Sequence, residues 1–250
     1  MSSIDINCDM GESFGLYQLG QDEKLMDYVS SVNIACGFHA GDPAVMRKTV
    51  DMAVRKKIAI GAHPGYPDLQ GFGRREMKLS ENDIYDIVLY QIGALNAFVC
   101  AAGATLHHVK PHGALYNTAA LNSPVATAIA RAVKDANENL VFVGLSGSVM
   151  IAEARKLGLR TASEVFADRT YQDDGTLTPR HLPNAMKESP EQAAAQVLQM
   201  VKGTVTTTSG KNIPVIAETV CIHGDGKSAL EFAKAIAHLL QENHVIIKQP

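Results

Sequence analysis

The sequence repeats one arrangement about seven times: a short apolar run, a polar loop rich in glycine, and a segment with helical periodicity. The stretch Val32–Pro43 shows this arrangement most clearly. Its apolar run, Val32–Cys36, is typical of a buried strand, and the loop that follows carries His39. Asp42 and Pro43 then predict the start of a helix, with Asp42 as the N-cap and Pro43 at the first helical position.

Strand, loop and helix in this repeated order predict an α/β fold with a parallel sheet. Every polar loop follows a strand, so all of these loops are expected at one end of the sheet. A closed ring lets every loop reach one centre, whereas an open sheet does not, and the number of polar loops therefore favours a barrel. The predicted strands are Ile4–Cys8, Val32–Cys36, Ile58–Ala62, Thr105–Val109, Leu140–Leu145, Arg160–Phe166 and Thr219–Ile222. The predicted helices include Asp22–Val29, a helix that begins at Pro43, Ser80–Gly103, Ser123–Ala136, Ser189–Val201 and Ser228–Gln241.

The chain has 250 residues, which is enough for one large domain with a substantial core. It contains no stretch that resembles a linker, so we predict a single βα domain over residues 1–250. Residues 203–216 depart from the repeated arrangement, because two β-prone runs flank Ser209 and Gly210. This pattern predicts a hairpin excursion there, and His244–Lys248 is expected to add a short edge strand.

The net charge, the N-terminal segment and the cysteine spacing argue against several kinds of partner and site. A net charge of -3 makes neither nucleic acid nor an anionic membrane an obvious partner. The N-terminus lacks the regions of a signal peptide, and no run approaches the length of a transmembrane helix, so a cytoplasmic location is expected. The 4 cysteines form no C-x-x-C pair, which argues against a zinc site built from them and predicts buried free thiols.

Titratable side chains follow the strands on six of the loops. Any one of them alone has an ordinary structural explanation, and Asp42 is already explained as a helix cap. Their recurrence predicts one shared site suited to acid–base chemistry, anion binding or a metal. We assign catalysis to Asp9, Glu12, His39, His63, Lys110 and His112, and binding of substrate or phosphate to Asp42, Asp168, Arg169, His223 and Asp225.

Five loop segments carry motifs that are specific enough to compare with known families. They are Asn7–Glu12, Asn33–Pro43, Gly61–Asp68, Lys110–Asn117 and Phe166–Arg169. In this order, and over nearly the whole chain, they resemble the LamB/YcsF family. The resemblance implies a seven-stranded parallel βα barrel, TIM-like and of the glycoside hydrolase or deacetylase type.

The resemblance also implies an activity. It implies ATP-dependent ring opening of 5-oxo-L-proline (pyroglutamate) to L-glutamate, by one component of a multi-subunit 5-oxoprolinase with subunits B and C as partners and ATP as co-substrate. A five-membered lactam is a stable amide, and phosphorylation of its carbonyl oxygen gives an imidate-like species that water attacks. In that chemistry Lys110 and Arg169 hold carboxylate or phosphate oxygens. Asp9 or His63 activates water.

Other hypotheses remain open at this point. Asp9, His39 and His63 on three successive strands could bind one zinc ion, which gives a metal-dependent amidohydrolase or deacetylase; a divalent metal is therefore a second cofactor hypothesis. The chain could instead be a non-catalytic subunit that holds substrate for its partners. In the third alternative the loop groups only cap helices and satisfy one another's hydrogen bonds.

Overall fold

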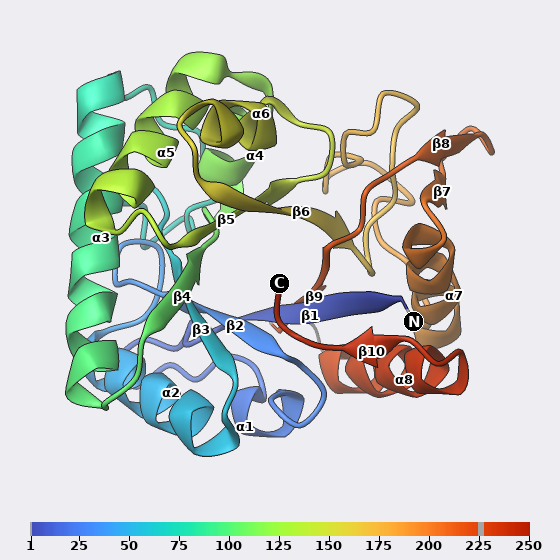
Figure 1. Ribbon diagram of the computed structural model, residues 1–250, viewed down its shortest axis with the longest axis horizontal. Coiled ribbons are helices and arrows are strands. Elements are labelled where there is room, and N and C mark those ends of the chain that lie inside the picture. Colours follow the sequence, from blue (N-terminus) through green and yellow to red (C-terminus); the bar gives the residue numbers. More distant parts are fainter. Residues whose placement is uncertain (1, 225–227) are drawn as a thin grey trace.

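The computed structural model describes residues 2–224 and 228–250. Seven parallel strands form a closed ring surrounded by helices (Figure 1). The order around the ring is β1-β2-β3-β4-β5-β6-β9, and the pairing of β9 with β1 closes it. The predicted seven-stranded parallel βα barrel is therefore confirmed. The strands are β1 (Ser3–Met10), β2 (Ser31–Ala35), β3 (Ala59–His63), β4 (Leu106–Val109), β5 (Val141–Leu145), β6 (Arg160–Phe166) and β9 (Thr219–His223).

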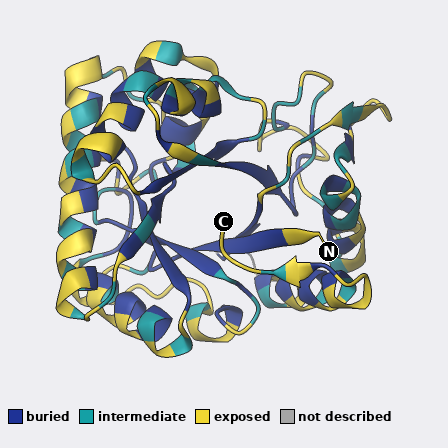
Figure 2. Ribbon diagram, viewed as in Figure 1, coloured by how far each residue is buried: buried dark blue, intermediate teal, exposed yellow. Residues whose placement is uncertain are grey.

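The helices cover the outside of the ring. One face of each helix is buried against the ring and the other is exposed (Figure 2), and the buried residues of α2, α5 and α8 are mostly apolar. Ser80 caps one of them through a reciprocal capping box with Asp83, as the sequence predicts. The helices are α1 (Asp22–Leu25), α2 (Pro43–Lys56), α3 (Glu81–Ala101), α4 (Gly113–Leu121), α5 (Ser123–Ala136), α6 (Val149–Lys156), α7 (Pro190–Val201) and α8 (Ala229–Glu242).

Two helices differ from the sequence prediction. α1 ends at Leu25 instead of Val29, so it is a single turn. α4 is absent from the prediction because its segment begins with Gly113, at φ +56°, and has no side-chain cap. Burial of Leu115 and Ala119 fixes this helix in place of a local start signal.

Three short strands lie outside the ring. β7 (Thr204–Thr206) and β8 (Asn212–Pro214) pair antiparallel as a hairpin. β10 (Ile246–Ile247) pairs in parallel with the start of β1. The hairpin lies between α7 and β9 along the chain, away from the ring.

Helix α3 is long and apolar enough, by length and composition alone, to cross a membrane. On that criterion the prediction that no run reaches this length is wrong. The reason is packing: α3 contacts α5 and β3, and Ile84, Val88, Ile92 and Leu95 are buried there. Its hydropathy is that of an outer barrel helix with one buried face.

The interior of the barrel is polar. Along β1, Asp5, Asn7 and Asp9 alternate with residues of the main apolar cluster. Asn7 reaches across the ring from β1 to β6, where its Nδ2 donates to Glu164 Oε1 at 3.0 Å. βα barrels usually fill this space with branched apolar side chains. Here a buried hydrogen-bonded network takes the place of many of them, and Val141, Val143 and Ala162 form a small separate apolar cluster on β5 and β6.

The imidazole ring of one histidine in this network lies directly over a glycine. His108 of β4 is fully buried, and a Cβ added to Gly61 would lie 2.1 Å from its Nε2. The absence of a side chain at Gly61 on β3 therefore makes room for the His108 ring.

The need for glycine at position 61 can be tested by comparing two glycine-to-alanine variants. Gly61→Ala should lower the free energy of unfolding by about 1–3 kcal/mol, because the new methyl group overpacks the barrel interior. Gly93→Ala is the control: this site in α3 has open space around it, and alanine should raise helix stability by about 0.5–1 kcal/mol. Urea denaturation of both variants measures the difference, and equal stabilities would contradict the packing argument.

Candidate functional site

A buried ammonium group lies at the centre of the barrel. Lys110 Nζ is 2.9 Å from Asp9 Oδ1 and 2.8 Å from Glu164 Oε1, and it donates to Asn7 Oδ1 at 3.2 Å and to Cys221 Sγ at 3.0 Å. Burial by itself lowers a lysine pKa, but Asp9, Cys221 and Glu164 together hold the pKa of Lys110 well above its ordinary value. The site therefore contains a permanent positive charge.

Two amide side chains and an imidazole orient the aspartate beside it. Asn33 Nδ2 donates to Asp9 Oδ1 at 2.8 Å and to Asn7 Oδ1 at 2.7 Å. His108 Nε2 donates in turn to Asn33 Oδ1 at 2.8 Å. Asn33 thus donates through Nδ2 to Asp9 and accepts through Oδ1 from His108. These linked hydrogen bonds fix the position of Asp9.

The charge state of Asp9 follows from its neighbours. Burial would raise the pKa of this carboxyl, but His63 and Lys110 beside it hold that pKa well below its ordinary value. Asp9 is therefore an ionised carboxylate and a weak base.

Two histidine rings face each other at the carboxyl ends of β3 and β4. His63 Nδ1 donates to the backbone carbonyl of Lys110 at 2.7 Å, and His112 Nε2 donates to the carbonyl of Phe72 at 2.8 Å. These bonds direct the other two nitrogens, His63 Nε2 and His112 Nδ1, toward each other at 2.9 Å. Asp9 Oδ2 lies 3.3 Å from His63 Nε2.

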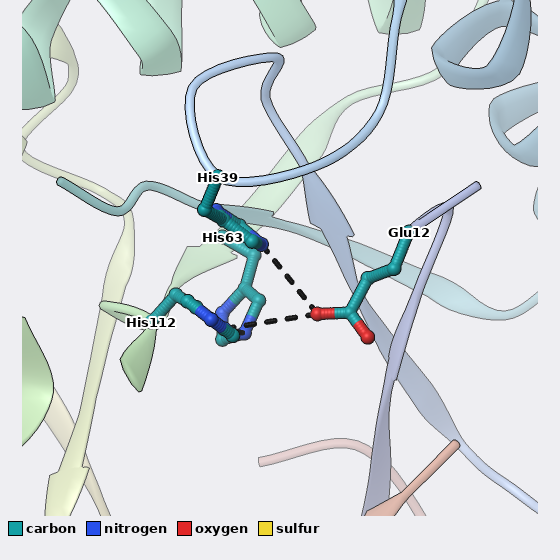
Figure 3. A group of neighbouring side chains, drawn as sticks. All are labelled: Glu12, His39, His63 and His112. Carbon is teal, nitrogen blue, oxygen red and sulfur yellow. Dashed lines mark hydrogen bonds and ion pairs between the residues drawn. The ribbon is translucent and has the colours of Figure 1, made fainter. Parts of the chain in front are cut away.

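A third ring, that of His39, packs flat on His112. The ring centroids are 3.7 Å apart and the planes are 5° from parallel. Glu12 Oε1 faces both rings, at 3.5 Å from His39 Nε2 and 3.7 Å from His112 Nδ1 (Figure 3). Burial, together with the neighbouring histidines, lowers the pKa of His39 and of His112 well below the usual value, so both rings are neutral near pH 7.

A cavity of about 900 Å³ opens over this cluster at the carboxyl end of the barrel. The lining also includes Arg74, Arg169 and Arg180, so the cavity combines a histidine and carboxylate floor with a cationic wall. Predicted residues that line it are Asp9, Glu12, His63, Lys110, His112, Arg169 and His223.

Arg169 is held in the long loop after β6. Its Nη2 donates to the carbonyl of Thr178 at 2.5 Å, and Gln196 Nε2 donates to the carbonyl of Arg169 at 2.8 Å. Within the described part of the chain, its buried Nε has no hydrogen-bond partner. Burial and the nearby charge of Arg180 lower its pKa to about 10, which still leaves it charged at neutral pH.

Three predicted site residues do not line the cavity. His39 lies behind His112. Asp168 accepts hydrogen bonds from His223 Nδ1, at 2.8 and 3.0 Å, and so positions that ring instead of facing a ligand. Asp42 lies further away and caps α2: its two oxygens accept from the N–H groups of Val45 and Gly15. Asp42 and Asp168 therefore have structural partners outside the cavity lining, and their ligand-binding role stays a prediction.

One predicted residue, Asp225, lies outside the described residues. Other members of the site are missing from the prediction: Asn7, Asn33, His108 and Glu164. Their signal was present as polar residues at alternate positions of apolar strands. That pattern marks the interior face of a strand but does not say what the face contacts.

Two groups of side chains could hold a metal ion among the described residues. Glu12, His39, His63 and His112 each place one ligand atom within 4.8 Å of the others. Asp9, Cys221 and His223 form a second such group. In the second group, burial raises the pKa of the Cys221 thiol well above its ordinary value, and Lys110 donates to its sulfur. The first group is therefore the better candidate.

The buried ion pairs predict a large effect of removing the ammonium group. Lys110→Met should cost about 3–5 kcal/mol of unfolding free energy, because Asp9 and Glu164 would remain buried without their cation. Lys110→Met combined with Glu164→Gln should recover part of the loss. Lys156→Met, at an exposed pair with Glu153, should have little effect. Chemical denaturation compares the variants, and equal losses at positions 110 and 156 would contradict a buried charge network.

The buried imidazole of His108 predicts a dependence of stability on pH. Burial, then the charges of His107 and Lys110, lower the pKa of His108 well below 6.5. The unfolded chain therefore binds a proton below pH 6.5 that the native protein does not, and stability falls as the pH falls. His108→Gln should reduce this slope between pH 6.5 and 5.5 by about 1 kcal/mol per pH unit, because the unfolded histidine is only partly protonated in that range. His238→Gln, at an exposed position on α8, is the control, and an unchanged slope in His108→Gln would refute the assignment.

Comparison with known proteins places this site in a family context. The LamB/YcsF family pattern matches residues 4–250. The chain is 57% identical over 241 residues to a Brevibacillus brevis protein named as the A subunit of 5-oxoprolinase, covering 96% of this chain and 95% of that one. It is 57% identical over 249 residues to the protein of the same name from Tolumonas auensis, covering 99% of each.

Solved structures agree with these relatives. The "Lactam Utilization Protein" from Thermus thermophilus superposes with a TM-score of 0.94 at 46% identity, covering 98% of this chain and 99% of that chain. A family 4 carbohydrate esterase from Streptomyces lividans has a TM-score of 0.52 at 11% identity, covering 99% of this chain and 92% of that chain. The esterase likeness shows a shared deacetylase-type barrel and nothing about the reaction.

Proposed function

The chain belongs to the LamB/YcsF family, and we propose that it opens the lactam ring of 5-oxo-L-proline to give L-glutamate, as the A subunit of an ATP-dependent 5-oxoprolinase. Relatives of the same length are named as that component of a 5-oxoprolinase, and a relative of known structure is called a lactam utilization protein. The observation that carries the proposal is the cavity floor, where ionised Asp9, charged Lys110 and neutral His112 meet.

The coupling to ATP follows from the stability of the amide. Transfer of the γ-phosphoryl group to the lactam oxygen forms a C–O–P bond and releases ADP. Water then adds to the ring carbon, the C–N bond breaks as the nitrogen takes a proton, and an acyl phosphate remains. A second water converts the acyl phosphate to the carboxylate of L-glutamate and free phosphate. The chain must therefore accept one proton from water and deliver one to nitrogen.

The neutral ring of His112 suits the proton-accepting role. Nδ1 of neutral His112 is unprotonated because Nε2 donates to the carbonyl of Phe72, whereas the groups beside Asp9 make its carboxylate a weak base. We therefore assign Asp9 to electrostatic stabilisation and orientation of His63, and give proton transfer to the histidines. Lys110 faces developing negative charge on the substrate oxygen.

The substrate carboxylate fits the cationic wall. Arg169 presents a buried Nε without a hydrogen-bond partner among the described residues, and its other side is anchored to Thr178. A guanidinium fixed in this way is suited to hold a carboxylate. Arg180 adds a second positive charge to the same wall.

The wider setting is also part of the proposal. Subunits B and C are the proposed partners, ATP is a co-substrate that the complex binds, and the enzyme is proposed to work in the cytoplasm. The word "subunit" in the relatives' names supports a complex.

The decisive measurement is release of L-glutamate from 5-oxoproline by this chain alone and with subunits B and C, with and without ATP. Turnover should require ATP and the full complex. In that complex, Arg169→Gln should raise the KM for 5-oxoproline at least about tenfold, because the substrate carboxylate loses one charged contact. The KM for ATP should be unchanged. Arg160→Gln, an exposed position at the start of β6, is the matched control.

Three outcomes would contradict the proposal in different ways. Turnover without ATP would favour a simple amidohydrolase. Binding of 5-oxoproline by this chain without any effect of cavity variants on turnover would favour a non-catalytic binding role. A parallel rise in the KM for ATP in Arg169→Gln would remove the assignment of Arg169 to the substrate carboxylate.

A further inference from the structure

The facing nitrogens of His63 and His112 need a positive charge between them. Each ring has its other nitrogen bonded to a backbone carbonyl, which only accepts, so that nitrogen carries the hydrogen. In a neutral ring the remaining nitrogen is then a lone pair. Two such lone pairs 2.9 Å apart, with the Asp9 carboxylate 3.3 Å away, repel one another unless a cation or a shared proton lies there.

We propose that His63 and His112, with Glu12 and Asp9, bind one divalent transition metal ion on the floor of the cavity. All four side chains line that cavity, so an ion can enter from solvent. The carbonyl bonds to the far nitrogens are the partners that fix metal-binding imidazoles in other proteins. Two imidazoles with two carboxylates suit zinc and its neighbours in the first transition series.

The distances match the spacing of ligand atoms around one metal ion. Metal–ligand bonds of about 2.0–2.2 Å place adjacent ligand atoms roughly 2.9–3.5 Å apart in tetrahedral or octahedral shells. The 2.9 Å between the nitrogens and the 3.3 Å from His63 Nε2 to Asp9 Oδ2 lie in that range. Glu12 Oε1, at 3.7 Å from His112 Nδ1, needs a shift of a few tenths of an ångström. A proton shared by the nitrogens would leave Asp9 and Glu12 as ion-pair partners of the two rings at 3.3 and 3.7 Å, so the metal titration below decides between an ion and a proton.

His39 is not a ligand in this arrangement, although it belongs to the same cluster. An imidazole binds a metal close to its own plane. His39 and His112 are parallel and 3.7 Å apart (Figure 3), so no single ion lies in both planes. His39 instead packs against His112. The proposed ligand set therefore differs from the set expected from the sequence, which was Asp9, His39 and His63.

The role of the ion in ring opening rests on the proposed function, whereas its binding does not. A bound divalent ion would occupy the lone pairs of His63 and His112, so it would replace these rings in preparing water for attack. It would polarise the lactam or phosphate oxygen and lower the pKa of a coordinated water. Lys110 lies beside Asp9 and would share the negative charge that develops there.

The test begins with metal binding. The full chain, freed of metal with a chelator, is titrated with Co²⁺ and Zn²⁺, and Co²⁺ absorption and calorimetry are recorded. One ion per chain should bind and raise the Tm. His112→Ala and Glu12→Gln should each weaken binding at least about tenfold, a loss seen even when only a hydrogen-bond partner of a ligand is removed. His39→Phe, which keeps the stack but has no nitrogen, should retain the affinity and the Co²⁺ spectrum.

Each other outcome overturns part of the proposal. No binding at about 1 mM ion, the weak end of measurable affinity, would mean that a proton holds the two nitrogens. Loss of binding in His39→Phe, with far-ultraviolet circular dichroism unchanged, would make His39 a ligand and refute the assignment. Full turnover by the metal-free complex would remove the catalytic role. Metal binding without any oxoprolinase turnover would leave the site standing and remove the proposed function instead.

Discussion

The ammonium group of Lys110 is the interaction on which the centre of this protein depends. It is buried, and its partners come from β6, β9 and β1, three consecutive strands across the ring from β4. Asp9 and Glu164 would each carry an uncompensated charge without it, at a cost of several kcal/mol. The amides of Asn7 and Asn33 then distribute the remaining hydrogen bonds, so the polar interior is satisfied as one network.

The same network prepares the chemistry at the mouth of the barrel. Asp9 is shared between the buried layer and the cavity: Oδ1 bonds to Lys110 and Asn33, and Oδ2 faces His63. The histidines are oriented by backbone carbonyls, which cannot change their hydrogen-bonding role with pH. One nitrogen of His63 and one of His112 are therefore held by groups that do not titrate.

The fold was largely predictable from periodicity, because every strand of the ring has an apolar run and most helices have a start signal. The site was predictable in part. Loop residues such as His63 and Lys110 follow strands, and that position alone brings them to one end of a barrel. Glu164 and Asn33 were missed because alternation along a strand defines a face without naming its partners. Asp42 was assigned to the site because a helix cap and a ligand use the same residue type. α4 was missed because its stability comes from burial of its side chains.

The closure of the barrel by β1 and β9 has a consequence for how the protein is made. Thr219 bonds to Asp5 across 214 residues of sequence, and Asn7 bonds to Glu164 across 157. Contacts between the two ends of a chain form late, since loop-closure entropy must be overcome first. A partly synthesised chain therefore holds β1 to β6 with Lys110 lacking its neighbours on β9. The network around Lys110 is therefore complete only once β9 has joined the ring.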